Sequence, residues 1–505
     1  MQAYQNALVY LLYVIAYFYI IIEFIYFTYI LYDVIIHIIL IFIERSYIFM
    51  NICKVFVPFG ALGTGITDEA FARGMELGPD IISADAGSTD SGPYYLGTGR
   101  AKYAKEAVKN DMRMLMIAAN KQSIPITIGT CGTCGVDACV DELEEICKEI
   151  CTEEGISAKI AKIYTQQSPQ VLKEKYQAGK IKPLSAAPEI NENIFEECSN
   201  IVALSGVEPF IEALKDGADI VLCGRATDTA VIAAMPIMKG CNEAAAWHAA
   251  KTAECGCICT TNPAGGGVFL TVDESGFLVE ATAPDSSCSV YSVSAHLLYE
   301  NSDPFYLVEP GVVIDTTQSV YEQLDNGKVY VKNTKIKKTP YTMKLEGATP
   351  AGYQTISLVG IRDRDIMKNP EAWILSMREY TEKKLLKLGF DPATYTYSLK
   401  PYGWNAVYGG AVPEDYNPNE IGLLLSVTAK SQELATKVAK VFNPYLLHFP
   451  VHKDKQLPTF AFPFSPAEIE RGKLYKFTLY HVVEVDNPLE LVRIEINDVH
   501  RQEVK

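Results

Sequence analysis

Basic residues are scarce in this chain of 505 residues: 45 Lys and Arg stand against 61 Asp and Glu, for a net charge of −16. A protein that binds nucleic acid needs a basic surface against the phosphates, so this charge balance excludes that class of partner. The thirteen cysteines lack the spacing of a secreted disulfide scaffold, and a chain of this length does not need one. We therefore expect two or three folded domains in a reducing, intracellular compartment.

Gly and Pro are both absent from residues 1–49, a segment dominated by Ile, Tyr and Phe. Its apolar run, 7–43, would form a helix of ~55 Å, too long for one span of a hydrocarbon core of ~30 Å, and no turn residue divides it into shorter spans. Glu23 and Asp33 would lie inside the membrane, which is unfavourable. We expect 1–49 to be translated upstream sequence, with Met50 as the start and a cytoplasmic protein. The alternative is a membrane anchor through 7–43, with the folded part in the cytoplasm.

Short apolar runs alternate with amphipathic stretches over residues 50–264, which predicts an α/β fold with a mostly parallel sheet and flanking helices. The predicted strands are 52–57, 80–84, 124–129, 157–163, 200–205 and 219–223. Period-two alternation predicts a β-rich region over 265–347, followed by a mixed α+β region over 348–505. Its last apolar segments, 473–485 and 489–496, are expected to form a hairpin. The pattern does not distinguish a doubly wound sheet from a barrel.

Small polar residues follow four of these predicted strands. The loops are PFGALGTGITDEAF (58–71), DAGSTDSGPYYLG (85–97), TCGTCGVDACVDEL (130–143) and GRATDTA (224–230). Ligands bind at the carboxyl ends of parallel strands, and glycine lets the backbone approach a ligand closely. We therefore expect 85–95, 129–137 and 224–228 to converge on one pocket.

The first candidate site in these loops is one for an anion. The backbone of Gly87, Ser88 and Thr89 offers N–H donors, and Tyr95 follows in the same loop. Arg225 has the planar fork that captures a carboxylate or phosphate through two hydrogen bonds. We predict that these residues bind the charged part of a ligand.

A second candidate is the loop with Gly129, Gly132 and Gly135 spaced three apart, which favours a phosphate cradle and a plain tight turn about equally. The spacing is not that of a dinucleotide-binding fingerprint, so an NAD-dependent dehydrogenase is a weaker hypothesis. Cys131 and Cys134 lie before a predicted helix, where a thiol pKa can be lowered. Because the cysteine spacing matches no standard cluster, we predict no metal site.

Proton transfer needs an acid and a base, and Asp90, Asp228 and His248 are the candidates. Asp228 is placed to act as a base, to orient the neighbouring arginine, or to cap the following helix, and capping is the simplest of these roles. His248, Lys251 and Glu254 lie along one face of an Ala-rich helix. That face is either exposed to solvent or, if buried, makes His248 and Lys251 an acid–base or anion-binding pair.

Several of these motifs occur in one order along residues 51–497. They are DAGSTDSGPYYLG, GVEPFIEALKDGADIVLCGRATDTA, AAWHAAKTAECG, SAHLLYENSDPF and FPFSPAEIERGKLYKFTLYHVVEVDNPLELVRIEI. Together they resemble the acyclic terpene utilisation AtuA family. The resemblance implies a catabolic protein linked to the breakdown of acyclic terpenes and related carboxylic or acyl-CoA acids. Longer members carry an additional C-terminal ferredoxin-like module, which we expect this chain to lack, and the family pattern begins near Met50.

The preferred hypothesis is a cytoplasmic enzyme that performs hydration, dehydration or another lyase step on an organic acid or acyl-CoA. Arg225 and the backbone of 87–89 would hold the anion, while Asp90 or His248 would move a proton. The alternative is a non-catalytic subunit that binds an acyl ligand within a catabolic complex. The sequence identifies no cofactor, and we expect a homo-oligomer.

Overall fold

The computed structural model describes residues 51–500 except 300, 302, 325, 414 and 452–459. Of the segment 1–49 it describes only 13–19 and the single positions 9, 24, 28, 31, 32 and 36, so the predictions made for that segment lie largely outside the described residues. Among the described residues, no helix combines the length and apolar character that crossing a membrane requires.

Five parallel strands form the centre of a ten-stranded sheet. They are, in spatial order, β1 (Cys53–Val57), β2 (Ile81–Asp85), β3 (Ile126–Gly129), β7 (Ile220–Cys223) and β4 (Ala158–Tyr164). Antiparallel strands extend the sheet: β8 (Val268–Val272), β9 (Gly276–Ala281), β13 (Lys328–Lys332) and β12 (Val320–Leu324) beyond β1, and β20 (Arg493–Val499) beyond β4. The sheet is open at both edges, so it is not a barrel, and the predicted β-rich region supplies part of it.

Helices cover both faces of this sheet, and its central strands are accordingly buried at nearly every position. Val55 and Val57 belong to the core under α8 (Glu208–Lys215), α9 (Asp228–Met238) and α10 (Glu243–Ala253). Phe56, between them, belongs to the opposite core under α2 (Asp68–Glu76), α4 (Lys105–Gln122) and α5 (Asp137–Glu154). The predicted α/β class with flanking helices is confirmed.

A second sheet is built around the twenty-residue strand β15 (Thr342–Ile361), in the order β16-β17-β15-β19-β5. Two predictions fail here. Strand β6 (Asn200–Ala203) pairs antiparallel with β15 and not within the parallel sheet. The expected hairpin does not form, because β19 (Ile469–Glu484) pairs with β15 whereas β20 pairs with β4.

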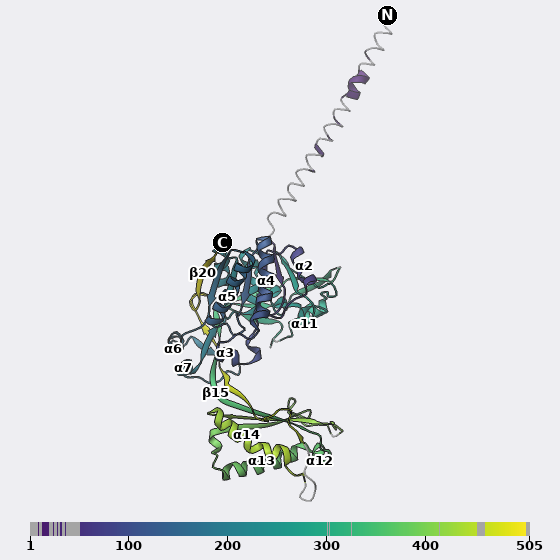
Figure 1. Cartoon of the computed structure of the whole chain (residues 1–505). Helices are drawn as coiled ribbons and strands as arrows, with labels where there is room; N and C mark the ends of the chain where they lie inside the picture. The colour runs from purple at the N-terminus through teal and green to yellow at the C-terminus, as the bar shows by residue number, and fades with distance from the viewer. Residues whose placement is uncertain are drawn as a thin grey trace.

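The distal half of β15 enters a separate lower body of the molecule (Figure 1). Along the chain this body contains β15, α12 (Arg364–Lys368), α13 (Pro370–Lys387), β16 (Tyr395–Tyr402), β17 (Ile421–Ala429), α14 (Gln432–His448), β18 (Phe460–Ala461) and β19. The alternation of strands with α13 and α14, and the antiparallel order β16-β17-β15-β19, match a ferredoxin-like unit. The family resemblance had led us to expect no ferredoxin-like module in this chain, so this unit was not predicted.

Smaller elements complete the upper body. They are α3 (Tyr94–Thr98), α6 (Pro169–Gln177), β5 (Ile181–Pro183), α7 (Ile194–Glu197), α11 (Val290–His296), β10 (Tyr306–Glu309), β11 (Val312–Asp315) and β14 (Lys335–Lys338). Strands β10, β11 and β14 form a three-stranded sheet that packs near α10. This small sheet and β15 both contribute acidic side chains to the site described next.

Candidate functional site

The loops that follow β2, β3 and β7 lie side by side at one edge of the sheet. Asp85 and Gly129, the last residues of β2 and β3, are paired in register. The Ala86 N–H donates to the Gly129 carbonyl at 2.9 Å, and the Cys131 N–H donates to the Cys223 carbonyl at 3.0 Å. These loops therefore lie together at one edge of the sheet, while the single pocket predicted for them and its role in binding a ligand stay predictions.

Arg225 lies at the centre of this edge and is buried. Its Nε donates to Glu346 Oε2 at 3.0 Å, and its Nη1 donates to Thr130 Oγ1 at 3.2 Å and lies 3.7 Å from Asp228 Oδ1. Burial disfavours the charged guanidinium, but the carboxylates of Glu346 and Asp228 outweigh burial and raise the Arg225 pKa. The fork that was expected to capture a ligand is therefore already engaged by the protein.

Glu346 reaches this edge from β15 of the second sheet. Its carboxylate accepts from Arg225, lies 3.0 Å from Lys344 Nζ, and accepts from Thr89 Oγ1 at 3.1 Å. Burial alone would raise the Glu346 pKa, but the charges of Arg225 and Lys344 lower it to about 2. Glu346 is thus held ionised, and it links the loop after β2 to the loop after β7.

Asp85 is a buried carboxyl whose pKa is shifted in the opposite direction, upward. Its Oδ2 accepts from the Gly87 N–H at 2.8 Å, and its Oδ1 has no hydrogen-bond partner within the described part of the chain. Burial, reinforced by the charge of Asp228, raises the pKa of Asp85 well above its ordinary value. Burial therefore favours the protonated form of Asp85 more than that of an ordinary aspartate.

A second group of charges adjoins the first from α10 and β10. Lys251 Nζ lies 2.8 Å from Glu254 Oε1, and Glu309 is buried nearby. Burial raises the pKa of Glu254 to about 8 in spite of Lys251. Burial also raises the pKa of Glu309, and it lowers the pKa of His296 to about 4 with help from the Lys251 charge.

Asp228 joins the two groups, since its charge interacts with both Arg225 and Lys251. Burial raises its pKa, although 32% of the side chain remains exposed. Asp228 does not cap α9: the cap is Thr227, whose Oγ1 accepts from the Ala230 N–H at 3.3 Å. The simplest role predicted for Asp228 is therefore wrong: its Oδ1 lies 3.7 Å from Arg225 Nη1, and the side chain is partly exposed.

Asp90 lies at the exposed rim of the cluster, in a short turn where its Oδ2 accepts from Ser88 Oγ at 2.6 Å. It is close enough for its charge to raise the pKa of Asp228. Tyr95 is half-buried in α3 and makes an edge contact with Tyr94 at 5.5 Å between ring centroids. The catalytic role predicted for Asp90 and the binding role predicted for Tyr95 are neither supported nor contradicted by these positions.

His248 is placed apart from these charges. It is completely buried, with Nδ1 2.7 Å from Thr334 Oγ1, Nε2 3.1 Å from the Tyr321 hydroxyl, and Phe277 against the ring. Burial lowers its pKa to about 3, with no charged group contributing. The predicted pairing with Lys251 is absent from the structure, because Lys251, one turn along the helix, faces Glu254 instead.

The glycines of the second loop allow close contacts within the protein itself. A Cβ on Gly129 would lie 2.7 Å from Asp85 Oδ1 and 2.3 Å from Val231 Cγ2. A Cβ on Gly135 would lie 2.3 Å from the backbone nitrogen of Arg225. At Gly132, with φ of +69°, a Cβ would lie 2.6 Å from Cys139 Sγ. These contacts explain the three glycines without a phosphate, and they hold Asp85 and Arg225 in place.

A hollow open to solvent lies between the loop after β1 and the segment that follows α10. Its lining is neutral and includes Phe59, Ile66, Ile258 and Pro263. One wall continues into Leu62, whose N–H donates to the Asp85 carbonyl at 2.8 Å, and the other begins at Cys255, next to Glu254. Both walls of the hollow are therefore continuous along the chain with residues that belong to or contact the charged cluster.

Residues 83–461 match the family described as acyclic terpene utilisation family protein AtuA. The chain belongs to this family. Comparison with curated proteins and with solved structures gives no match. AtuA-family membership agrees with the catabolic role that the resemblance implied, and it leaves the chemical step open.

Sequence reasoning missed three of the buried acids. Asp85 had a visible signal, a carboxylate at the last position of a wholly buried strand. Glu309 lies on the buried phase of β10, in alternation with Leu307, which is also a readable signal. Glu346 follows Leu345 in a strand that reads as ordinary β structure, so nothing local marks it. Among the described residues, no group of three or more His, Cys, Asp or Glu is arranged to hold a metal ion.

Proposed function

We propose that this AtuA-family chain is a catabolic enzyme that adds or removes water, or performs another lyase step, on an organic acid or its acyl-CoA. The observation that carries the proposal is that the pKa values of carboxyls in one cluster are shifted in opposite directions, some upward and one downward. The pKa of Glu346 is lowered to about 2 because Arg225 and Lys344 outweigh burial, whereas burial raises that of Glu254 to about 8. A site that holds ionised and protonated carboxyls at one pH can accept one proton and donate another.

The roles follow from exposure and charge. Asp228, the partly exposed carboxylate, is assigned as the base that takes a proton from the carbon next to the substrate carbonyl. Protonated Glu254 gives its proton to the departing hydroxyl, so that water leaves and a carbon–carbon double bond forms; hydration is the reverse. Lys251 stabilises the negative charge that develops on the carbonyl oxygen.

The two ends of the substrate need different surroundings. The neutral hollow beside the cluster suits an apolar chain, because its lining residues carry no charge. Since Arg225 is occupied by Glu346, we assign the charged end to Lys344, whose side chain is one-third exposed, and to the Ser88–Thr89 turn. The raised pKa of Asp85 beside Asp228 makes Asp85 a second candidate acid.

Proton exchange in heavy water tests this proposal without knowledge of the full reaction. The purified chain is incubated with branched unsaturated acids and β-hydroxy acids, each free and as its CoA thioester. Nuclear magnetic resonance then follows deuterium incorporation at the carbon next to the carbonyl. We expect exchange with at least one compound and a loss of roughly a hundredfold or more in Asp228→Asn.

Asp68→Asn is the matched control, because Asp68 is also the first residue of a helix capped by a threonine, but it is exposed. It should exchange at the wild-type rate. Binding of an acid or thioester with no exchange in the wild-type chain would contradict catalysis and favour the ligand-binding subunit. Equal rates in Asp228→Asn and wild type would remove Asp228 as the base.

A further inference from the structure

We propose that Cys134 and Cys139 form a reversible disulfide when the folded protein meets a hydroperoxide. Their sulfur atoms lie 3.7 Å apart, and both cysteines are buried in the loop and first turn of α5. A disulfide bond is about 2 Å long, so the sulfurs need to approach by only ~1.7 Å. The proposal is independent of the function proposed above.

This pair differs from the other cysteines of the chain. None of the thirteen forms a disulfide bond in the structure, and a thiol–thiol hydrogen bond joins Cys134 to Cys139. The hydrogen bond from Cys139 lowers the pKa of Cys134 against the effect of burial, and the Arg225 charge adds to it. By contrast, burial raises the pKa of Cys147, whose neighbour Cys151 lies one turn away on the same helix. A thiolate is the nucleophile in thiol oxidation, so Cys134 is the first to react.

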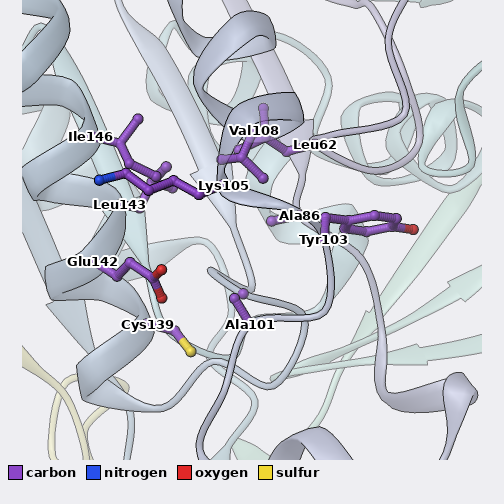
Figure 2. A pocket seen from close by; sticks show the side chains of 11 residues that line it. Leu62, Ala86, Ala101, Tyr103, Lys105, Val108, Cys139, Glu142, Leu143 and Ile146 are labelled. Atoms are coloured by element: carbon purple, nitrogen blue, oxygen red, sulfur yellow. The ribbon is translucent and has the colours of Figure 1, made fainter.

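A narrow hollow between α4 and α5 reaches Cys139, whose sulfur lies 3.7 Å from that of Cys134. Cys139 lines this hollow with Ala101, Leu143 and Ile146, all labelled in Figure 2. Gly132 also lines it, and a side chain there would press on the Cys139 sulfur. The lining is mostly apolar, with Lys105 and Glu142 also present, and the narrow space suits only a small hydroperoxide.

The reaction balances with the hydroperoxide as the one oxidant. The Cys134 thiolate attacks the outer peroxide oxygen, the O–O bond breaks, and the alkoxide leaves and takes a proton to become an alcohol. The resulting sulfenic acid on Cys134 is attacked by the Cys139 sulfur, which loses its proton as the S–S bond forms and hydroxide leaves as water. Two thiols are oxidised, and one hydroperoxide is reduced to alcohol and water.

Disulfide formation would act on the charged cluster through the shared loop. The same loop carries Thr130, which accepts from Arg225 Nη1 at 3.2 Å, and Gly135, which packs directly on the Arg225 backbone. Both thiols also contact carbonyls of the preceding segment, Cys134 that of Arg100 and Cys139 that of Gly99, each at 3.8 Å. Oxidation removes these contacts and draws the loop toward α5.

Peptide mapping of the full chain tests the proposal. The reduced protein is treated with hydrogen peroxide, free thiols are blocked by alkylation, and the chain is cleaved before aspartates. This cleavage gives a fragment 111–136, with Cys131 and Cys134, and a fragment 137–140, with Cys139 alone. We expect the two fragments to be joined after oxidation and separated again by dithiothreitol.

Variants assign the bond. The link should persist in Cys131→Ser and in Cys147→Ser, and it should be lost in Cys134→Ser. Circular dichroism of the oxidised wild-type chain checks that the bond forms in the folded state, so the result does not depend on any variant folding. Separate fragments after oxidation, or a link that survives in Cys134→Ser, would overturn the proposal.

Discussion

Arg225 and Glu346 form a buried salt bridge, with 3.0 Å between Nε and Oε2, that joins the parallel sheet to the second sheet. The two residues are 121 positions apart in the chain. Thr130 and Thr89 complete the arrangement, one bonded to each partner. Because both charges are buried, each depends on the other to remain ionised.

Glu346→Gln should therefore destabilise the protein strongly, since it leaves the Arg225 charge buried without its carboxylate. We expect a loss of about 3–5 kcal/mol in the free energy of unfolding, measured by urea denaturation. The double variant Arg225→Met with Glu346→Leu removes both charges and should recover much of that loss. Arg225→Lys keeps the charge but not the planar fork, so its free energy of unfolding should lie between those of wild type and Glu346→Gln. If Glu346→Gln unfolds at the same urea concentration as wild type, the buried Arg225 charge does not depend on Glu346.

Asp85→Asn tests whether Asp85 carries a proton. If the carboxyl is neutral, Asn replaces it with little change of shape or charge, and the melting temperature should stay within a few degrees of wild type. Asp111→Asn is the contrast: Asp111 Oδ2 accepts from the Gly63 and Gly65 N–H groups at 2.8 and 3.1 Å, so its variant should melt lower. A large drop in Asp85→Asn alone would show that Asp85 is ionised.

The parallel part of the fold was predictable because its strands are short, apolar runs with helices between them. Each predicted strand exists, but periodicity does not name a strand's partner. Strand β6 has the same apolar character as its neighbours and pairs with β15, more than 140 residues away, at Ala203 and Leu345. The expected hairpin failed for the same reason, because the turn at 486–488 connects two sheets.

The candidate site was predictable only where its residues end parallel strands. Arg225 and the loop that begins at Asp85 were found in this way, since strand ends share one edge of a sheet. Glu346 and Glu309 come from other sheets, and no local pattern brings them to that edge. His248 looked equally chemical in the sequence, yet it serves the core between α10 and β12.

His248→Gln should reduce stability without affecting proton exchange. The pKa of His248 is lowered to about 3 by burial, so as pH falls below about 6.5 the unfolded chain gains a proton that the folded chain does not. Its contribution to stability is therefore lost as pH falls from about 6.5 toward 3. In His248→Gln the melting temperature should fall less on acidification than it does in wild type, while the rate of deuterium exchange should match wild type. If His248→Gln lost deuterium exchange while its melting temperature stayed unchanged, His248 would be a catalytic residue after all.

Glu254 is expected to make stability depend on pH in the opposite direction. Burial, opposed by Lys251 and supported by Asp228 and Glu309, raises its pKa to about 8. Between about pH 4.5 and 8 the unfolded chain loses this proton and the folded chain keeps it, so stability falls as pH rises through that window. Glu254→Gln is neutral at every pH, and its melting temperature should exceed that of wild type increasingly from pH 5 to pH 8. Glu243→Gln, at the start of the same helix and paired with Lys338 outside the cluster, should follow the wild-type curve. If Glu254→Gln instead melts lower than wild type at pH 8, the carboxylate is ionised in the folded state, and Lys251 with Glu254 is a structural ion pair with no proton to donate.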